Sequence, residues 1–437
     1  MLGLNKNKIR IAILLASTSI VPASLSAIDM NAAIQSAVKT NPDVLAKQSE
    51  KKSTEFRVDQ EKGSYFPKVD VQAGAGWEKI KQHYKANRLN GAINGSVGPK
   101  DRYDPQFTIT QKLFDGFETC NRVAKARKET IQSQKNVEES MMLRAYDAAD
   151  AYITVRRFQR LVALAKENVS VHKDILSKTK ALVDAGKATA SDLHSVEARL
   201  SDAQAAVDDI NGDYETSKAN FIEVSGLEPT KLEKVTIDKK MLPANLEEAL
   251  TAARENNRSV IVAKATVDVA NYDFEITKAP LMPSLDFQVN GRRSIDVAGK
   301  NGHETDITGL FQARFNVFNG GRDIAKTREF RERVAASKHR TEGEVRRAEK
   351  EVRISFAAYT SAHNQSKYLR QAVADKTKVQ DVYREQFAAG KRSYAELLDA
   401  SHEKFLAKGS LITSEATQDL SALRLLAAMG KLLDNYG

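Results

Sequence analysis

The sequence predicts a mainly α-helical chain with a small β part, built from two copies of one unit. A phrase that begins Ala-Gly-Lys occurs at Ala185–Lys187 and again at Ala389–Lys391, an offset of 204 residues. Two long tracts, 117–185 and 322–389, contain no proline and can therefore form long helices. Four shorter stretches alternate apolar and polar residues, which is typical of strands with one apolar face. We therefore expect an elongated, duplicated protein rather than a set of compact domains.

The duplication sets the predicted domain boundaries. The offset of 204 residues also relates Phe114–Gly116 to Phe318–Gly320, whereas upstream it is 216, as between Asn41 and Asn257. The first unit therefore carries 12 additional residues ahead of its second strand. The predicted order is a signal peptide at about 1–27, a first repeat at 28–228, a linker at 229–243 and a second repeat at 244–437. Within each repeat an initial helix precedes a strand hairpin, at 68–114 and 284–318, and then a coiled-coil hairpin, at 115–225 and 321–432.

The N-terminus has the pattern of a secretory signal peptide. Basic residues from Lys6 to Arg10 precede the apolar run 11–21, which is too short to span a bilayer. The small residues at 24–27 allow more than one cleavage site. We therefore expect an exported protein. Its single cysteine, Cys120, excludes an internal disulfide and a multi-cysteine metal site.

The four alternating stretches are the candidate strands 68–79, 106–114, 284–292 and 309–318. Each has about the ten residues that a tilted strand needs to cross a membrane, although a half-buried hairpin of a soluble sheet has the same pattern. Aromatic residues border these stretches, where they would lie at the lipid headgroups: Tyr65, Phe66, Trp77, Phe114 and Phe318. Four strands cannot close a barrel, and an open edge in lipid leaves amides unpaired. Membrane strands would therefore require several copies of the chain to share one barrel.

The long tracts are predicted to form coiled-coil hairpins. A continuous helix over 117–185 would be roughly 100 Å long, too long for one globular core to bury. Beyond the first Ala-Gly-Lys phrase, apolar residues recur at three- and four-residue steps, and only Ser217 interrupts the series with a polar residue. They are Leu193, Val196, Leu200, Ala203, Val207, Ile210, Tyr214, Phe221 and Val224. The repeated glycine then caps a helix at the far tip of each hairpin.

These features together resemble the TolC family of outer-membrane efflux and secretion channels. The resemblance rests on "LFDGFETCNRVAKAR" (113–127), "VFNGGRDIAKTR" (317–328), the two Ala-Gly-Lys phrases and the duplication. The first motif is most similar to the branch that serves type I secretion systems. The resemblance implies a homotrimer with a twelve-stranded barrel in outer-membrane lipid, continued by a periplasmic tunnel of twelve helices. It also implies a periplasmic adaptor (a membrane fusion protein) and an inner-membrane ABC or proton-driven transporter.

The resemblance places a gate at the tips. Asp192 and Arg392 match a polar pair that holds the tunnel entrance shut, and Phe387 stands where the family can have a tyrosine. Glu396, in place of an aspartate, and Asp399 match two acids that ring the constriction. Their spacing of three puts them on one helix face, and this spacing by itself is more typical of a solvated face than of a pore. In a trimer, six such carboxylates would attract cations.

The turn residues Gly186, Lys187, Gly390 and Lys391 match the region that adaptors approach. The net charge is +10, but the basic residues are interspersed with acidic ones and form no cluster with aromatic residues. We therefore expect no nucleic-acid partner. We find no phosphate loop, metal-ligand set or catalytic motif, and therefore expect no enzyme activity and no cofactor. The passenger, whether protein, drug or metal, stays open. The alternative is an exported, soluble coiled-coil adaptor or scaffold of a transport complex.

Overall fold

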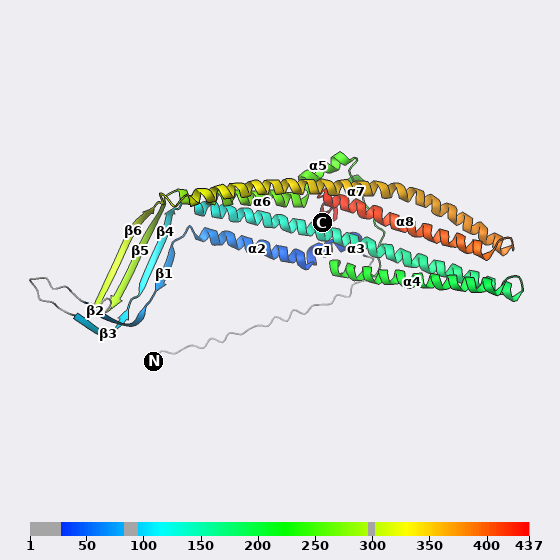
Figure 1. Ribbon diagram of the computed structural model, residues 1–437, viewed down its shortest axis with the longest axis horizontal. Coiled ribbons are helices and arrows are strands. Elements are labelled where there is room, and N and C mark those ends of the chain that lie inside the picture. The colour runs from blue at the N-terminus through cyan, green and yellow to red at the C-terminus, as the bar shows by residue number, and fades with distance from the viewer. Residues whose placement is uncertain (1–27, 83–94, 296–301, 437) are drawn as a thin grey trace, which may run out of the picture.

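The protein is an elongated rod with a β-sheet at one end and helical hairpin tips at the other (Figure 1). The structure is a computed structural model that describes residues 28–82, 95–295 and 302–436. The predicted signal peptide lies outside the described residues, as does the loop 83–94 between the first two strands. Among the described helices, none is both long and apolar enough to cross a bilayer.

The sheet has four strands in chain order. Its segments are β1 (Lys68–Gln72), β2 (Ala75–Gln82), β3 (Gly95–Tyr103), β4 (Gln106–Phe114), β5 (Ser284–Ile295) and β6 (His303–Arg314). The first strand consists of β1 and β2 and pairs antiparallel with the second, which consists of β3 and β4; β4 pairs with β5, and β5 with β6. Gly74 and Asp104 exchange backbone hydrogen bonds of 2.9 and 3.5 Å where these two strands are interrupted. The four predicted strands are therefore present. The second starts earlier than the alternation at 106–114 indicates, and the fourth, predicted at 309–318, lies at His303–Arg314.

The register of the sheet separates an apolar face from a polar face. Val71, Phe107, Gly291 and Ile307 lie side by side across the four strands on one face. Val71 and Ile307 are 79% and 75% exposed there, although both are aliphatic. On the other face the Thr108 hydroxyl donates to the Asn290 side-chain oxygen at 3.0 Å. The exposed apolar face is the one that lipid would cover.

Two helices of 67 residues run from the sheet to the tips and confirm the predicted rods. They are α3 (Glu118–Asp184) and α7 (Arg322–Ala388). At the tips the chain returns through α4 (Ala190–Ser225) and α8 (Tyr394–Ala428). The predicted row of packing residues on α4 is continuous, because Ser217, its one polar member, is also buried. The Ser217 hydroxyl donates to the Tyr214 carbonyl oxygen.

The initial helix of each repeat is in fact two helices, contrary to the prediction. They are α1 (Met30–Thr40) and α2 (Pro42–Gly63) in the first half, and α5 (Leu246–Asn256) and α6 (Arg258–Ile276) in the second. Asn41 and Asn257 take extended backbone conformations between the helices, and each side-chain oxygen caps the next helix. Their side-chain nitrogens donate to the carbonyl oxygens of Val224 and Ala428, near the ends of α4 and α8. In each half, the asparagine between the two initial helices is thus hydrogen-bonded to the helix that returns from the tip, α4 or α8.

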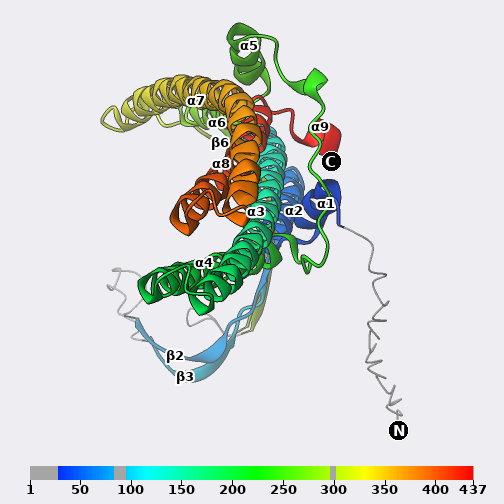
Figure 2. The ribbon, with the colours of Figure 1, turned by 90° about the vertical axis from the view of Figure 1, so that its right-hand side faces the viewer.

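The main core lies midway along the rod, where α1 and α5 pack on the long helices. Tyr152 on α3 is fully buried there, packs edge-on against Phe221, and its hydroxyl lies 2.8 Å from the Ile28 carbonyl oxygen. The remaining short helices are η1 (Lys239–Met241), η2 (Ala279–Leu281) and α9 (Leu433–Tyr436). Seen from the tips, the long helices form an arc with α1, α5 and α9 on its convex side (Figure 2). The chain therefore has the shape of a curved wall segment.

Candidate functional site

Both Ala-Gly-Lys phrases end an α-helix in the same way, with the glycine in the left-handed backbone conformation. At the end of α3, Gly186 has φ 67°, and the backbone N–H groups of Gly186 and Lys187 donate to the carbonyl oxygens of Val183 and Leu182 at 2.9 and 2.8 Å. The end of α7 repeats this arrangement, with Gly390 at φ 71°. Two such bonds on a glycine with positive φ are a Schellman motif, which satisfies the last carbonyl groups of the helix. The prediction that each phrase lies at the tip of a helical hairpin is therefore confirmed.

The acid six residues after each glycine has a structural task. In the first tip the Asp192 carboxylate accepts the backbone N–H of Thr189 at 2.9 Å, and the Thr189 hydroxyl accepts the N–H of Asp192 at 3.2 Å. This is a capping box, which satisfies two otherwise unpaired donors at the start of α4. Hydrogen bonds from the Thr189 backbone, then from its side chain and from Tyr394 of the second tip, lower the pKa of Asp192. Asp192 is therefore ionised and held in its own turn.

The second tip has the same capping box with an arginine added. Ser393 and Glu396 form the reciprocal bonds at 3.2 and 3.3 Å, and Arg392 forms an ion pair with Glu396. The guanidinium of Arg392 also donates to Gln386 at 2.9 Å and lies 3.9 Å from the ring centre of Tyr383. The Ser393 backbone and hydroxyl, followed by Arg392, lower the pKa of Glu396. Glu396 therefore carries a charge that an arginine of its own tip compensates.

An ion pair that the sequence did not reveal joins the two hairpins. Arg199 on α4 lies 3.3 Å from the carboxylate of Asp399 on α8. Both side chains are largely exposed, so the pair is accessible to water. Arg199 is one of many charged residues on the long helices, and nothing in the local sequence shows that its side chain faces the other hairpin. The capping boxes, by contrast, were readable from the Thr-x-x-Asp and Ser-x-x-Glu spacings.

The structure brings some predicted site residues together and separates others. Arg392 meets Glu396, while within the part of the chain that the structure describes no bond joins Arg392 to Asp192. Phe387 is buried in a small core with Ile175 and Val196 beneath the tips. The turn residues Gly186, Lys187, Gly390 and Lys391 are all exposed at the outermost end of the rod.

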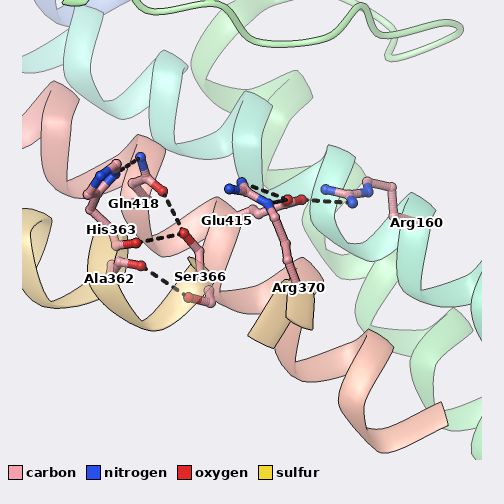
Figure 3. A network of polar contacts seen from close by, with 8 residues as sticks. Arg160, Ala362, His363, Ser366, Arg370, Glu415 and Gln418 are labelled. Atoms are coloured by element: carbon pink, nitrogen blue, oxygen red, sulfur yellow. Dashed lines mark hydrogen bonds and ion pairs between the residues drawn. The ribbon is translucent and has the colours of Figure 1, made fainter. Parts of the chain in front are cut away.

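A second polar network crosses the hairpins further from the tips. Glu415 on α8 accepts from Arg160 on α3 at 2.9 Å and from Arg370 on α7 at 3.2 Å (Figure 3). Ser366 donates to Gln418 at 3.2 Å one turn away, again between α7 and α8. Glu415 thus bridges three helices and connects the two hairpins at a distance from their tips. Such a network is more stabilising than an isolated surface pair.

The half-buried carboxyl of Asp419 lies beside this network. Burial raises its pKa to about 6, against the lowering effects of Arg156 and Arg160. The Tyr436 hydroxyl, on α9, also has a raised pKa because of burial. No group of three or more potential metal ligands occurs among the described residues, and the His303–Glu304 pair stands on an exposed strand.

An antiparallel sheet with an exposed apolar face, continued by two long helical hairpins, defines a membrane channel of the tunnel type. The model of the outer membrane efflux protein family matches residues 33–227 and 249–431, once in each half. The chain belongs to the outer membrane efflux protein family, and its place is the outer membrane. This family consists of transport channels and not of enzymes, and the membership decides against the alternative of a soluble adaptor.

Known proteins of similar sequence and structure agree with this assignment. The chain is 22% identical to the outer membrane efflux protein BepC of Brucella suis biovar 1 (strain 1330), over 79% of this chain and 77% of BepC. It is 23% identical to the proteases secretion protein PrtF of Dickeya chrysanthemi, over 79% of this chain and 76% of PrtF. A crystal structure of CusC, a protein described as forming a transmembrane channel, has a TM-score of 0.77 at 15% identity and covers 92% of both chains.

Proposed function

We propose that three copies of this chain form a passive conduit that carries secreted proteins across the periplasm and the outer membrane. The observation that supports this most is the open sheet. Within the described residues, the strand β1–β2 and the strand β6 are each paired on one side only. Unpaired edges are costly in lipid, and twelve strands from three chains would close a barrel without any edge. Threefold closure also fits the cyclic symmetry that most homo-oligomers have.

The curvature of the helical part supports the same assembly. The long helices form an arc, and the short helices cover only its convex side (Figure 2). Three such arcs would enclose a tunnel of twelve helices roughly 100 Å long. The common order of elements in both halves, with 67 residues in α3 and in α7, supports the proposed duplication.

The tips would form the gate of this tunnel. Glu396 and Asp399 would ring the constriction, and Arg392 would reach Asp192 of a neighbouring chain when the ring closes. In the single chain each acid is already next to an arginine, Arg392 or Arg199. When the tips open or close, Glu396 and Asp399 would therefore exchange one arginine partner for another and would not be left unpaired. The exposed turns at Lys187 and Lys391 would contact the periplasmic adaptor.

The conduit would draw its energy from a partner and catalyse no reaction of its own. An inner-membrane ABC or proton-driven transporter, coupled through the adaptor, would drive the passenger into the tunnel. Type I protein secretion is the favoured use, because the motif at 113–127 resembles that branch and PrtF is by name a secretion protein for proteases. Drug efflux is the competing use, since BepC is by name an efflux protein.

Deletion of the gene separates these uses. We expect the culture supernatant of the deletion strain to lack one or a few secreted proteins, with drug sensitivity changed little. Complementation with the intact gene should restore those proteins. An unchanged secreted proteome together with sharply increased drug sensitivity would favour efflux and contradict the secretion proposal.

A further inference from the structure

The apolar face of the sheet has a groove of about 240 Å³. It lies toward Ile295 and His303, the ends of β5 and β6. These ends of the two strands are remote from the helices (Figure 1). Its floor is the Phe107 ring, which covers Gly291, and its walls are Val71 and Ile307. The ring of Phe107 lies directly on Gly291, where any added Cβ would come within 2.1 Å of a ring carbon. The next glycine on this face, Gly309, has no atom within 4 Å of a notional Cβ, so the groove stays open toward the middle of the sheet.

One end of the groove is polar. Arg293 lies two residues beyond Gly291 on the same face of β5, and Thr305 is its register partner on β6. Among the described residues, Arg293 has no carboxylate partner. The neighbouring Arg292 points to the opposite face, where its guanidinium lies 3.7 Å from Asp104. The arginine on the polar face is therefore paired, while the one on the apolar face is available to a ligand.

Aromatic residues fix the depth of Arg293 in the membrane. Tyr103 pairs with Ile295, one step beyond Arg293 on the same face, and Trp77 lies further out on the first strand. Both aromatic side chains are exposed, Trp77 at 74%. Exposed Trp and Tyr residues on the lipid face of a barrel mark the headgroup level. Arg293 therefore lies at the headgroups and the groove lies just inside the hydrocarbon.

We infer that this groove binds a phosphate-bearing, acylated lipid of the outer leaflet. One acyl chain lies in the groove along the Phe107 ring, toward the open position at Gly309, and the lipid phosphate pairs with Arg293. The apolar floor and the single cation at headgroup depth match the two parts of such a lipid, whereas a free phosphate would contact only Arg293. The inference rests on the proposed function, because that function places the helices in the periplasm and these strand ends at the outer surface.

The test measures lipid retention by the intact oligomer. Wild-type protein is purified in detergent, delipidated, shown to insert into planar bilayers and incubated with diphosphoryl lipid A before native mass spectrometry. We expect one lipid A per chain. Arg293→Gln should weaken retention about fivefold, the effect of one cation near a charged membrane surface. Ile307→Trp, which narrows the groove without touching Arg293, should weaken it as well.

The matched control is Arg292→Gln, which removes the adjacent arginine on the polar face and should leave retention unchanged. Phosphatidylcholine should be retained less than lipid A, and inorganic phosphate at millimolar concentration should not displace the lipid. Equal retention by wild type, Arg293→Gln and Ile307→Trp would overturn the inference, as would displacement by phosphate alone. A wild-type protein that never inserts into bilayers would instead contradict the proposed function, and the inference with it.

Discussion

Arg199 of the first hairpin and Asp399 of the second are joined by an ion pair of 3.3 Å, close to the tips of the rod. The pair is largely exposed, so each copy contributes only about 0.5 kcal/mol. Three copies in a trimer would contribute about 1.5 kcal/mol, which changes the ratio of closed to open tips about tenfold. A weak bond repeated three times would thus bias the proposed gate toward its closed form.

Removing this pair should open the channel. We predict that Arg199→Ala or Asp399→Ala raises the mean single-channel conductance in planar bilayers, because the hairpins lose one connection in every protomer. The exchanged variant, Arg199→Asp with Asp399→Arg, should return the conductance toward the wild-type value. Conductance that is raised equally in the exchanged variant would show that the charges do not act as a pair.

The acids of the second tip should control ion selectivity. Replacing Glu396 and Asp399 by glutamine and asparagine removes six negative charges from the proposed ring and should reduce the preference for cations. The measurement is the reversal potential in a salt gradient. A control that changes Glu403, an acid of the same helix that pairs with Lys376, should keep the selectivity. Unchanged selectivity in the first variant would mean that the ring acids do not line the pore.

The capping boxes should stabilise the tips locally. Thr189→Ala and Ser393→Ala each remove the hydroxyl that accepts the third N–H of the following helix, at a cost of about 1 kcal/mol. We expect faster amide hydrogen exchange over the first turns of α4 and α8, with the sheet and main core unaffected. Thr189→Ser should retain protection, because it retains the acceptor. Uniformly faster exchange along the whole chain would argue against a local role.

Asp419 should make stability depend on pH. Its raised pKa of about 6 means that the folded protein binds a proton more readily than the unfolded chain. The destabilising effect is therefore complete above pH 6 and disappears as the pH falls toward 4. We predict that Asp419→Asn stabilises the protein by up to about 3 kcal/mol at pH 8 and by about a third of that at pH 4.5. Thermal unfolding followed by circular dichroism at both pH values measures this difference. An equal effect at both values would show that burial of this carboxyl is not its cause.

The sequence predicted the long-range plan of the fold because that plan depends on periodicity and repetition. Absence of proline over 117–185 and the alternation at 284–292 are local patterns, and each led to the observed element. The break at Asn41 was missed although Pro42 signals it, since a residue before proline is disfavoured inside a helix and proline suits the first position of a new one. The occurrence of asparagine at the equivalent position 257 is a further signal, because asparagine is a preferred residue at helix N-termini.

The site was predictable in position but not in its bonds. The two tips follow from Gly186 and Gly390, and the capping boxes follow from spacing. The pairing of Arg199 with Asp399 depends on how two hairpins 200 residues apart in sequence lie against each other, which no local pattern encodes. Sequence reasoning also assigned Asp192 and Glu396 to the gate alone, whereas the structure shows that both first serve to begin a helix.

The proposed conduit depends most directly on the assembly of three chains into one barrel. The decisive measurement is the mass of the purified, detergent-solubilised protein by light scattering coupled to size exclusion, followed by cryo-electron microscopy of the same sample. We predict a particle of three chains with threefold symmetry, a twelve-stranded barrel and a single helical tunnel. A monomer or dimer that is soluble without detergent would contradict the account.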